Sequence, residues 1–338
     1  MIVVEKSGAL TTIQDLGRTG YERFGVSPAG PMDVRSFLLA NLLVGNTRNS
    51  AAMEISIMGP TLRFTESSVI AITGCNVAPR VKGKLLPLYT AVKIEAGDVV
   101  QMGIAPSGCR AYLAVAGGFV VPAVMGSCAT SIQNKIGGKE GRKLQKGDEL
   151  QIGKSTKTLE SLVGRAVKKE SFGQTQPVTI RVIMGPQDKE FTQAGLATFL
   201  NSTYQVGNDS NRMGYRLNGP IIEHEGDGNI ISDGIVTGSV QVPTAGLPII
   251  MLAERQTVGG YTKIATVITV DLPKVGQCRP GDSIRFQAVD IDTAQKLYAD
   301  EQEALAKIEQ DLQAGNYPIT YEVAVGAKKY TVTVQKIK

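Results

Sequence analysis

"PGDSIRF", residues 280–286, is one of three related segments that decide the fold of this chain of 338 residues. The other two are "AGDVVQM" at 96–102 and "KGDELQI" at 146–152. In each segment a Gly-Asp pair suits a tight turn, and the residues after it alternate in polarity, which is typical of a strand leaving a turn. The chain is therefore predicted to be mainly β, with two β-barrel-like domains.

The composition fits a globular chain that has many turns and more than one core. Apolar residues make up 42% of the chain, and its 38 glycines sit in short clusters between runs of Val and Ile. A length of 338 residues exceeds the usual size of a single core, so two domains are expected. The net charge of +5 is modest and the basic residues are scattered, which gives little support for a nucleic-acid partner.

Cysteine usage and the long apolar stretches bear on the compartment. The four cysteines lie far apart and the single His224 has no second histidine, so we expect a reduced, cytoplasmic chain without a metal site. Two uncharged stretches, 111–134 and 234–253, are long enough to span a membrane. Their Gly, Pro and polar residues would interrupt a spanning helix, so buried strands are predicted and no membrane partner is expected.

Three helices are predicted from apolar residues at helical spacing. They span about 32–44, about 189–200 and 293–314. The third is the clearest, with Asp292 as its expected N-cap and Gly315 as its stop.

A polar, Lys-rich stretch between Gly153 and Pro177 predicts a domain boundary. The expected units are a β domain at 1–170, a second β domain at 176–290, and a helix with a β-hairpin at 291–338.

The segment "LAERQTVGGYTKIATVITVDLPK", residues 252–274, places charges around a Gly-Gly turn before an apolar run. Burying an ion costs roughly several kcal/mol unless the ion is paired or contacts a ligand. If the flanking apolar runs are neighbouring strands, then Glu254, Arg255 and Gln256 end one strand, and Tyr261 and Lys263 begin the next. These side chains would converge on one rim of a barrel. Both a ligand site and an ion-paired structural turn fit this pattern.

Two segments predict no site. "GKS" at 153–155 lacks the spacing of a phosphate loop and is interpreted as an ordinary turn. "HEGDG" at 224–228 is interpreted as a solvated loop.

Three further segments could contribute to a site. In "SDGIVTGSVQVP", residues 232–243, Thr237, Ser239 and Gln241 share one strand face with Asp233 at its head, which suits either a polar pocket or a solvated strand face. The long loop at 11–33 carries Gln14 and Arg18, and binding and scaffold roles remain equally open for it. The segment 208–220 offers two further candidates, Arg212 and Arg216. Their planar guanidinium groups suit a carboxylate or a phosphate.

Taken together and in order, several segments resemble the second-subunit family of allophanate hydrolase type, also called the biotin-dependent carboxyltransferase family. Within it the resemblance is to the branch that holds the C subunit of 5-oxoprolinase (PxpC) and KipA. The matching segments are "TTIQDLGRTGYERFGVSPAGPMD", "ANLLVGN", "AITGCN", "AVAGGFVVPAVMGSCATS", "GGKEGRKLQKGD", "NRMGYRL", "SDGIVTGSVQVP", "LAERQTVGGYTKIATVITVDLPK" and "RPGDSIRF".

The resemblance implies β-barrel domains, the C-terminal one cyclophilin-like, and ATP-driven opening of 5-oxoproline, a small lactam, to glutamate. It implies two partners, a KipI-like protein (PxpB) and a further component (PxpA), and ATP with Mg²⁺ shared among the three proteins. Under this interpretation the expected catalytic residues are Lys263, Asp233 and Arg255, and the expected substrate-binding residues are Gln241, Ser239, Thr237, Arg212, Arg216, Tyr261, Gln256, Arg18 and Gln14.

Two other functions fit the same resemblance. One is a KipA-like regulator that binds and antagonises a KipI-like kinase inhibitor. The other is half of a carboxyltransferase that acts on a urea-like amide with a partner biotinyl domain. No lysine follows a methionine in this chain, so it carries no biotin attachment motif and covalently bound biotin is not expected. The chain departs from the family pattern at Cys128, Leu247 and Thr262.

Overall fold

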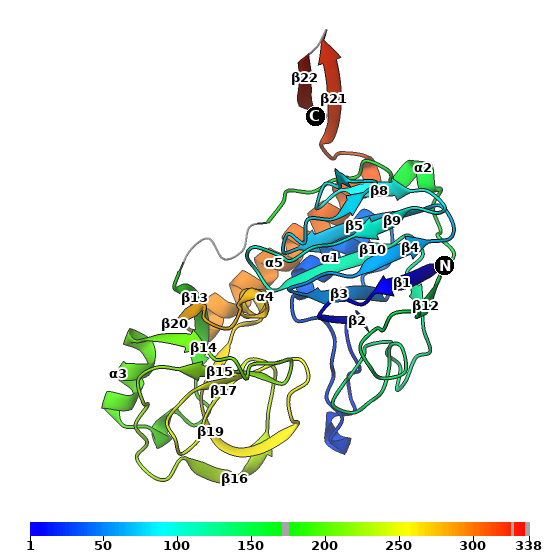
Figure 1. The fold of residues 1–338 in the computed structure, drawn as a ribbon. Coiled ribbons are helices and arrows are strands. Elements are labelled where there is room, and N and C mark those ends of the chain that lie inside the picture. Colours follow the sequence, from blue (N-terminus) through cyan, green and yellow to red (C-terminus); the bar gives the residue numbers. More distant parts are fainter. Residues whose placement is uncertain (171–175, 326–327, 335–338) are drawn as a thin grey trace.

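The structure, a computed structural model, describes residues 1–170, 176–325 and 328–334 (Figure 1). Two mainly antiparallel sheets form from the first half of the chain. The seven-stranded sheet has the order β11 (Phe119–Val120), β12 (Glu149–Ile152), β1 (Ile2–Lys6), β4 (Thr61–Phe64), β9 (Val99–Gln101), β6 (Arg80–Val81) and β7 (Lys84–Leu85). The five-stranded sheet has the order β2 (Leu10–Gln14), β3 (Ala52–Ser56), β10 (Arg110–Val115), β5 (Ser68–Gly74) and β8 (Ala91–Ile94).

These two sheets share one apolar core. Ile2 and Phe64 of the seven-stranded sheet belong to the same buried cluster as Ile55 and Ile72 of the five-stranded sheet. Burying such side chains gives on the order of 1.5–3 kcal/mol each, so the shared core holds the sheets together.

The second half of the chain forms one eight-stranded sheet. Its order is β13 (Val178–Met184), β20 (Ser283–Ala288), β14 (Thr203–Val206), β15 (Gly214–Asn218), β18 (Ile249–Met251), β17 (Ser239–Val242), β19 (Val258–Val267) and β16 (Asn229–Gly234). Because β13 also pairs with β19, seven of these strands close into a barrel, and β16 lies outside the ring beside β19. The barrel interior is filled with apolar side chains such as Ile180, Val240 and Ile264. The mainly β prediction is confirmed.

Each of the three Gly-Asp turns leads into a strand, as predicted. The strands that follow them are β9, β12 and β20. The glycines of all three turns have positive φ, at Gly97, Gly147 and Gly281, a backbone conformation that glycine adopts without steric cost.

The helices are α1 (Val34–Leu43), α2 (Leu159–Leu162), α3 (Gln193–Asn201), α4 (Leu272–Gln277) and α5 (Ile291–Ala314), with single 3-10 turns η1 (Glu22–Phe24), η2 (Asp188–Glu190) and η3 (Thr269–Asp271). The helices predicted at 32–44 and 293–314 are confirmed. The N-cap prediction for α5 is wrong, because Asp290 rather than Asp292 accepts the hydrogen bond from the Thr293 amide, at 2.7 Å. The helix predicted from residue 189 begins only at Gln193, since Thr192 is its N-cap.

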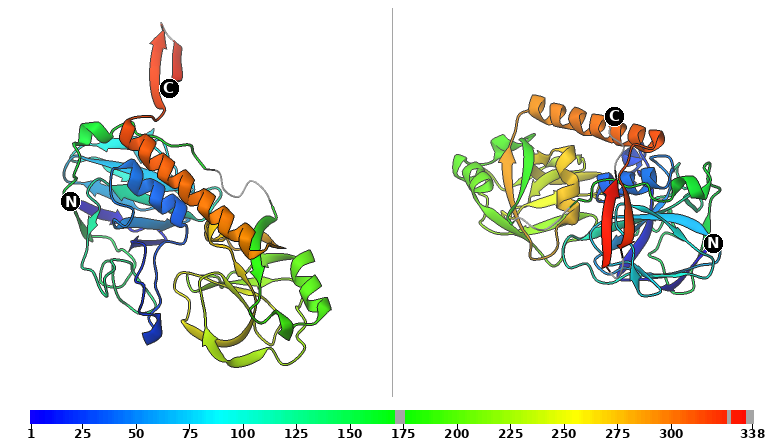
Figure 2. Two further views of the ribbon diagram at one scale, coloured as in Figure 1. Left: turned by 180° about the vertical axis from the view of Figure 1, so that it is seen from behind. Right: turned by 90° about the horizontal axis from the view of Figure 1, so that it is seen from above.

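Helix α5 spans both halves of the molecule. Figure 2 shows it crossing the back of the structure, from the barrel to the helix α1 that covers the five-stranded sheet. Leu305 and Leu312 of α5 join Phe37 and Leu39 of α1 in a buried cluster. The predicted terminal hairpin follows as β21 (Ile319–Val325) and β22 (Lys328–Val334).

Neither uncharged stretch forms a long helix, since residues 111–134 and 234–253 fold into strands, turns and loops. Within the described parts of the chain, no helix has both the length and the apolar character needed to cross a membrane. The boundary predicted between 170 and 176 falls on residues 171–175, which lie outside the described residues, so the domain division stays a prediction.

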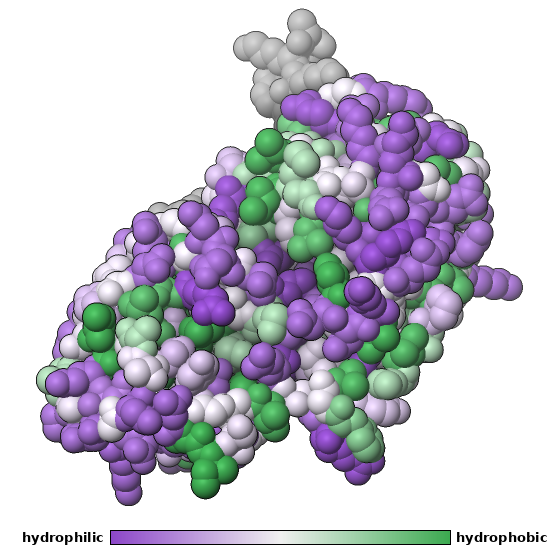
Figure 3. Space-filling model, turned by 60° about the horizontal axis from the view of Figure 1, so that its bottom comes forward, coloured by the Kyte–Doolittle hydropathy of each residue, from purple (hydrophilic) through white to green (hydrophobic). Residues whose placement is uncertain are grey.

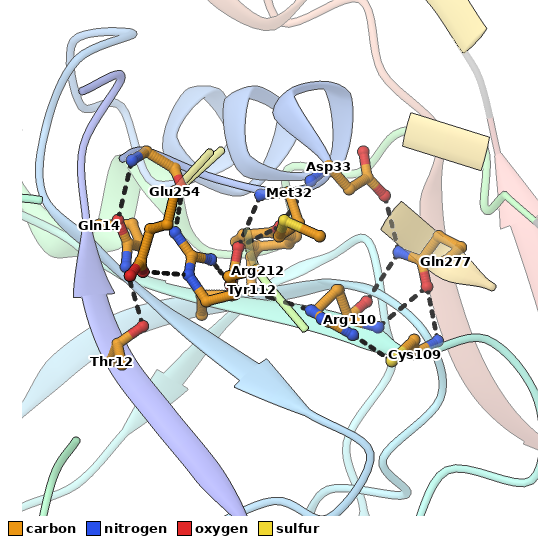
Figure 4. A network of polar contacts seen from close by, with 12 residues as sticks. Thr12, Gln14, Met32, Asp33, Cys109, Arg110, Tyr112, Arg212, Glu254 and Gln277 are labelled. Carbon is orange, nitrogen blue, oxygen red and sulfur yellow. Dashed lines mark hydrogen bonds and ion pairs between the residues drawn. The ribbon is translucent and has the colours of Figure 1, made fainter. Parts of the chain in front are cut away.

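A buried amide joins the two halves. The side chain of Gln277, at the end of α4, accepts hydrogen bonds from the backbone amides of Cys109 and Arg110 at 2.9 and 3.0 Å (Figure 4). It donates to Asp33 Oδ2 at 2.7 Å and to the Arg110 carbonyl at 2.8 Å. The amide is buried, so none of these four bonds can be replaced readily by water.

Truncation of this amide should loosen the joint. We expect Gln277→Ala to lower the free energy of unfolding by about 3 kcal/mol, because it leaves buried donors and acceptors unpaired. Denaturant titration followed by circular dichroism measures the effect. Gln205→Ala is the control, since Gln205 is exposed and makes one bond to the Gly281 carbonyl. Equal stability of the two variants would contradict the role of Gln277.

Asp33 should make stability depend on pH. Burial raises the pKa of this carboxyl group from 3.8 to about 6. Its contribution to stability is therefore complete below pH 3.8 and is lost as the pH rises through 6. Relative to Asp33→Asn, the wild type should lose about 2 kcal/mol between pH 4.5 and pH 7.5, measured by urea unfolding at both values. Parallel pH dependence of the two proteins would contradict this assignment.

Candidate functional site

The centre of the candidate site is the Arg212 guanidinium, which is buried between the two halves. Its Nε donates to Glu254 Oε1 at 2.7 Å, its Nη1 to Glu54 Oε1, and its Nη2 to the Gly30 carbonyl at 2.6 Å (Figure 4). Burial lowers the pKa of Arg212, but Glu54 and Glu254 outweigh it and leave the pKa raised. All three guanidinium nitrogens have acceptors within the protein, so Arg212 positions other groups rather than offering a free fork to a ligand.

Glu54 and Tyr112 are residues that the sequence interpretation missed. Glu54 lies on β3, and its Oε2 accepts from the Met32 amide at 2.8 Å and from the Tyr112 hydroxyl at 2.7 Å. The signal was present, since Glu54 is a charge within the apolar run "AMEIS", and a buried carboxylate needs partners.

Arg255 follows Glu254 directly and is held at the same joint. Glu254 Oε2 accepts from the Gln133 amide at 3.3 Å, and the Ala253 carbonyl accepts from the Ala29 amide at 3.1 Å. Arg255 is buried; its Nε donates to the Ile235 carbonyl at 2.9 Å, and its Nη1 has no partner among the described residues. Burial lowers the pKa of Arg255, an effect that Glu22 of the facing loop partly offsets.

Lys263 and Arg255 both bond the short segment at residues 233–235. Its amine is buried and donates to Asp233 Oδ2 at 2.6 Å and to the Gly234 carbonyl at 3.1 Å. The Lys263 amine holds the pKa of Asp233, which is itself exposed, below its usual value. Lys263 and Arg255 thus donate to consecutive carbonyls, those of Gly234 and Ile235. Two buried cations therefore converge at residues 233–235.

The predicted polar row begins just before β17, at Thr237, and a register shift lies between Val240 and Gln241. Ser239 and Gln241 are buried and Thr237 is half-buried. Gln241 lies opposite Lys263 in the β17–β19 pairing, and its Nε2 has no partner among the described residues. The prediction of a turn at Gly259 and Gly260 is wrong, because both glycines lie within β19. A Cβ atom at Gly259 would come within 3.0 Å of this nitrogen, so Gly259 leaves room for the Gln241 amide.

Arg18 and Gln14 differ in whether their side-chain polar atoms have hydrogen-bond partners among the described residues. Gln14 donates to Thr12 Oγ1 and the Thr130 carbonyl at 3.0 and 3.1 Å and accepts from the Gly30 amide at 3.2 Å, so it braces the loop. Arg18 is buried and bonds the Ala129 carbonyl, while its Nη1 has no partner within the described chain. Burial lowers the pKa of Arg18, with Asp15 and Glu254 opposing that effect.

The remaining predicted residues lie at the surface. Tyr261 is exposed on β19, and Gln256 is exposed just before this strand. Arg216 is exposed on β15 and pairs with Asp209 at 3.1 Å, and no bond links it to Arg255 or Lys263.

The arrangement suits a small anion. Arg18, Gln241 and Arg255 each keep a buried donor without an acceptor among the described residues, and a buried unpaired donor is costly unless a ligand satisfies it. Figure 3 shows the surface hollowed between the two halves, with hydrophilic residues gathered along the hollow. A pocket of about 200 Å³ also opens beside Arg212 and Glu254, a volume suited to a small molecule.

The chain is similar to one family model and to several known proteins. Residues 24–288 match the family model described as carboxyltransferase domain, subdomain A and B. The chain is 38% identical over 302 residues to the C subunit of 5-oxoprolinase from Escherichia coli (strain K12), covering 89% of this chain and 96% of that protein. It is also 38% identical over 290 residues to the C subunit of 5-oxoprolinase from Haemophilus influenzae, covering 85% and 90% of the two chains.

A solved structure is also similar. The crystal structure of the K. lactis urea amidolyase superposes with a TM-score of 0.83 at 31% identity. The match covers 91% of this chain but 20% of that much longer protein.

Removal of the unpaired donors should weaken binding of small carboxylates. We expect Arg255→Met and Gln241→Leu each to raise the Kd for a small carboxylate such as acetate ten- to a hundredfold, since a hydrogen bond to a charged group contributes roughly 1.5–3 kcal/mol. Isothermal titration calorimetry measures the Kd. Arg216→Met is the control and should leave it unchanged. Wild-type affinity in both site variants would rule out these donors as the anion site.

Proposed function

The chain belongs to the family of carboxyltransferase domains with subdomains A and B, and from this membership we propose that it is the C subunit of a 5-oxoprolinase. With its partner proteins PxpA and PxpB it would open 5-oxo-L-proline to L-glutamate, driven by ATP. The observation that carries the proposal is the pair of unpartnered donors on Arg255 and Gln241 beside the amine of Lys263. The Escherichia coli relative, a 5-oxoprolinase component matched over 96% of its length, supports the choice of substrate.

The reaction needs an activated amide. A lactam carbonyl is stabilised by resonance, so the proposed first step transfers the γ-phosphoryl group of ATP to the lactam oxygen and releases ADP. Water then attacks the former carbonyl carbon, the C–N bond of the ring breaks, and the nitrogen takes a proton, which leaves an acyl phosphate. A second water molecule hydrolyses the acyl phosphate to the carboxylate and inorganic phosphate. Overall, 5-oxoproline, ATP and two water molecules give glutamate, ADP and phosphate. Negative charge is spread over the phosphoryl group that the lactam oxygen receives, and buried cations stabilise it effectively.

Each of the three side chains has a distinct proposed role. Arg255 Nη1 and Gln241 Nε2 bind the carboxylate of the substrate and fix its orientation. Lys263 faces the lactam oxygen: an ammonium group has three donors, and two of them already bond Asp233 and the Gly234 carbonyl. The third donor is left for the lactam oxygen and the phosphoryl group that it receives. Asp233 orients the amine.

The chain would not act alone. We place ATP with Mg²⁺ at a site shared with the partner proteins, the KipI-like PxpB and PxpA. No biotin is expected to be attached to this chain. The four cysteines are free thiols, which fits a cytoplasmic enzyme in a reducing environment.

The test is a reconstituted assay. The chain is mixed with purified PxpA and PxpB, and ATP hydrolysis is followed with and without 5-oxoproline. Hydrolysis should depend on the lactam and should fall a hundredfold or more in Lys263→Ala, because one charge-stabilising donor typically contributes about that factor. Arg216→Ala should retain wild-type turnover. Unchanged turnover in Lys263→Ala, with the protein folded by circular dichroism, would refute the proposed site.

A second candidate function is carboxyl transfer from a biotinyl domain to a urea-like amide. The similarity to the K. lactis urea amidolyase supports this alternative. A parallel assay distinguishes the two: urea and a carboxybiotinylated carrier domain replace the lactam and ATP, and carboxylation of urea is measured. A third outcome, stable binding of a KipI-like protein with restored kinase activity but no turnover of any amide, would favour the regulatory alternative.

A further inference from the structure

Strand β16 and the first residues of β19 form a two-stranded ribbon at the free side of the barrel. Asn229 lies opposite Tyr261, and Gly234 opposite Val258. From Thr262 onward β19 pairs instead with β17 and β13. Among the described strands β16 has one neighbour, β19, so its outer edge is open (Figure 1).

The ribbon exposes large apolar side chains. Ile231 is 94% exposed, Val236 and Val258 are each 58% exposed, and Tyr261 is 42% exposed. Every residue of β16 is exposed or half-buried, so neither face of the strand is covered. A two-stranded ribbon that buries little is only marginally stable in water, and grouped apolar side chains on a surface mark interaction sites. Figure 3 shows hydrophobic patches at the rim of the hollow.

The apolar side chains of the ribbon are exposed although the ribbon is firmly bonded to the barrel. Lys263 bonds Asp233 and the Gly234 carbonyl at one end of β16, and Arg255 bonds the next carbonyl, that of Ile235. The base of the ribbon is therefore fixed to the barrel by two buried cations, and its apolar side chains are presented at a defined position.

The edge of β16 lacks some of the usual protection, although its pairing with β19 has an irregular register between Asn229 and Asp233, as at a β-bulge. Natural edge strands are commonly blocked by Lys, by Pro or by a covering element. The β16 sequence "NIISDG" contains neither Lys nor Pro, and its single carboxylate, Asp233, is engaged by Lys263. Such an edge can accept a further strand from another chain.

An acidic rim lies at the start of the ribbon, although the chain as a whole has a net charge of +5. Two segments meet there: the Glu225 amide donates to the Glu190 carbonyl, and Thr192 bonds the Glu223 side chain. His224 connects this rim to β19 through Thr262. The ionised groups of the rim, five carboxylates and one lysine, are Asp188, Glu190, Glu223, Glu225, Asp227 and Lys189.

We propose that the β16–β19 ribbon is the docking surface for another protein component of the same enzyme. The partner adds a strand to the outer edge of β16, covers Ile231, Val236 and Val258, and brings Lys or Arg side chains to the acidic rim. This inference rests on the proposed function for the identity of the partner. The similar region of the K. lactis urea amidolyase is 20% of a longer chain, so there it is joined to other domains. A second copy of this chain is an alternative occupant, which sedimentation analysis distinguishes from a partner protein.

The test measures binding directly and does not depend on catalysis. Purified PxpA and PxpB are each titrated into the full chain by calorimetry, for the wild type, Ile231→Lys and Val258→Lys. One of these two proteins should bind the wild type, and each variant should weaken that binding at least tenfold. Raising the salt concentration from about 0.05 to about 0.5 M should also weaken it, because exposed charge pairs are screened. Leu85→Lys is the matched control: Leu85 is 59% exposed on β7, in the other half of the molecule, and this variant should bind as the wild type does.

The outcomes separate this proposal from the proposed function. Undiminished binding by both ribbon variants, or no binding of either partner protein by the wild type, would overturn the docking surface. A dimer of this chain in sedimentation analysis that Ile231→Lys dissociates would overturn it in favour of a second copy. Weakened binding by the ribbon variants, in a complex that does not turn over 5-oxoproline, would support the surface and count against the proposed function. In an active complex, an excess of the partner should restore the turnover of the ribbon variants, which keep Lys263 and Arg255.

Discussion

The burial of Arg212 constrains the rest of the structure. A guanidinium group withdrawn from water is stable only when its donors meet acceptors, and here these come from three distant segments: Glu54 on β3, Glu254 after β18 and the Gly30 carbonyl before α1. Because these acceptors belong to both halves of the molecule, the pairing is complete only when the halves are closed against each other. Arg255 is the next residue after Glu254, so the same pairing places it at the joint.

Local patterns in the sequence predicted most of the fold. A Gly-Asp turn and the alternation after it involve only neighbouring residues, which is why β9, β12 and β20 could be recognised directly. The N-cap of α5 was misplaced by two residues, since Asp290 and Asp292 both precede an apolar pattern and only backbone geometry decides which carboxylate faces the Thr293 amide. The closure of the barrel through the pairing of β13 with β19 is likewise a long-range event.

The site was predictable only where its residues lie close together in the sequence. Arg255 and Lys263 lie near each other in the sequence, so their shared location could be expected, although β17 separates β18 and β19, the strands that were predicted to be neighbours. The role of Arg212 could not, because its partner Glu54 lies 158 residues away and no local pattern links the two. Arg212 and Gln14 look like ligand-binding residues in the sequence, yet the protein itself supplies their partners. Unpaired buried donors, which identify Gln241 and Arg255, become visible only in three dimensions.

Residues 233–235 connect the proposed chemistry to the proposed interface. Lys263 and Arg255 hold this segment from within the barrel, while the same segment ends the ribbon that carries Ile231. A partner that fixes the ribbon also fixes the acceptors of both cations, and so fixes the positions of their remaining donors, which the ligand would use. Coupling of this kind is reciprocal: the free energy by which a partner favours the ligand equals that by which the ligand favours the partner. The proposed dependence of activity on the complex is the expected result of such shared contacts.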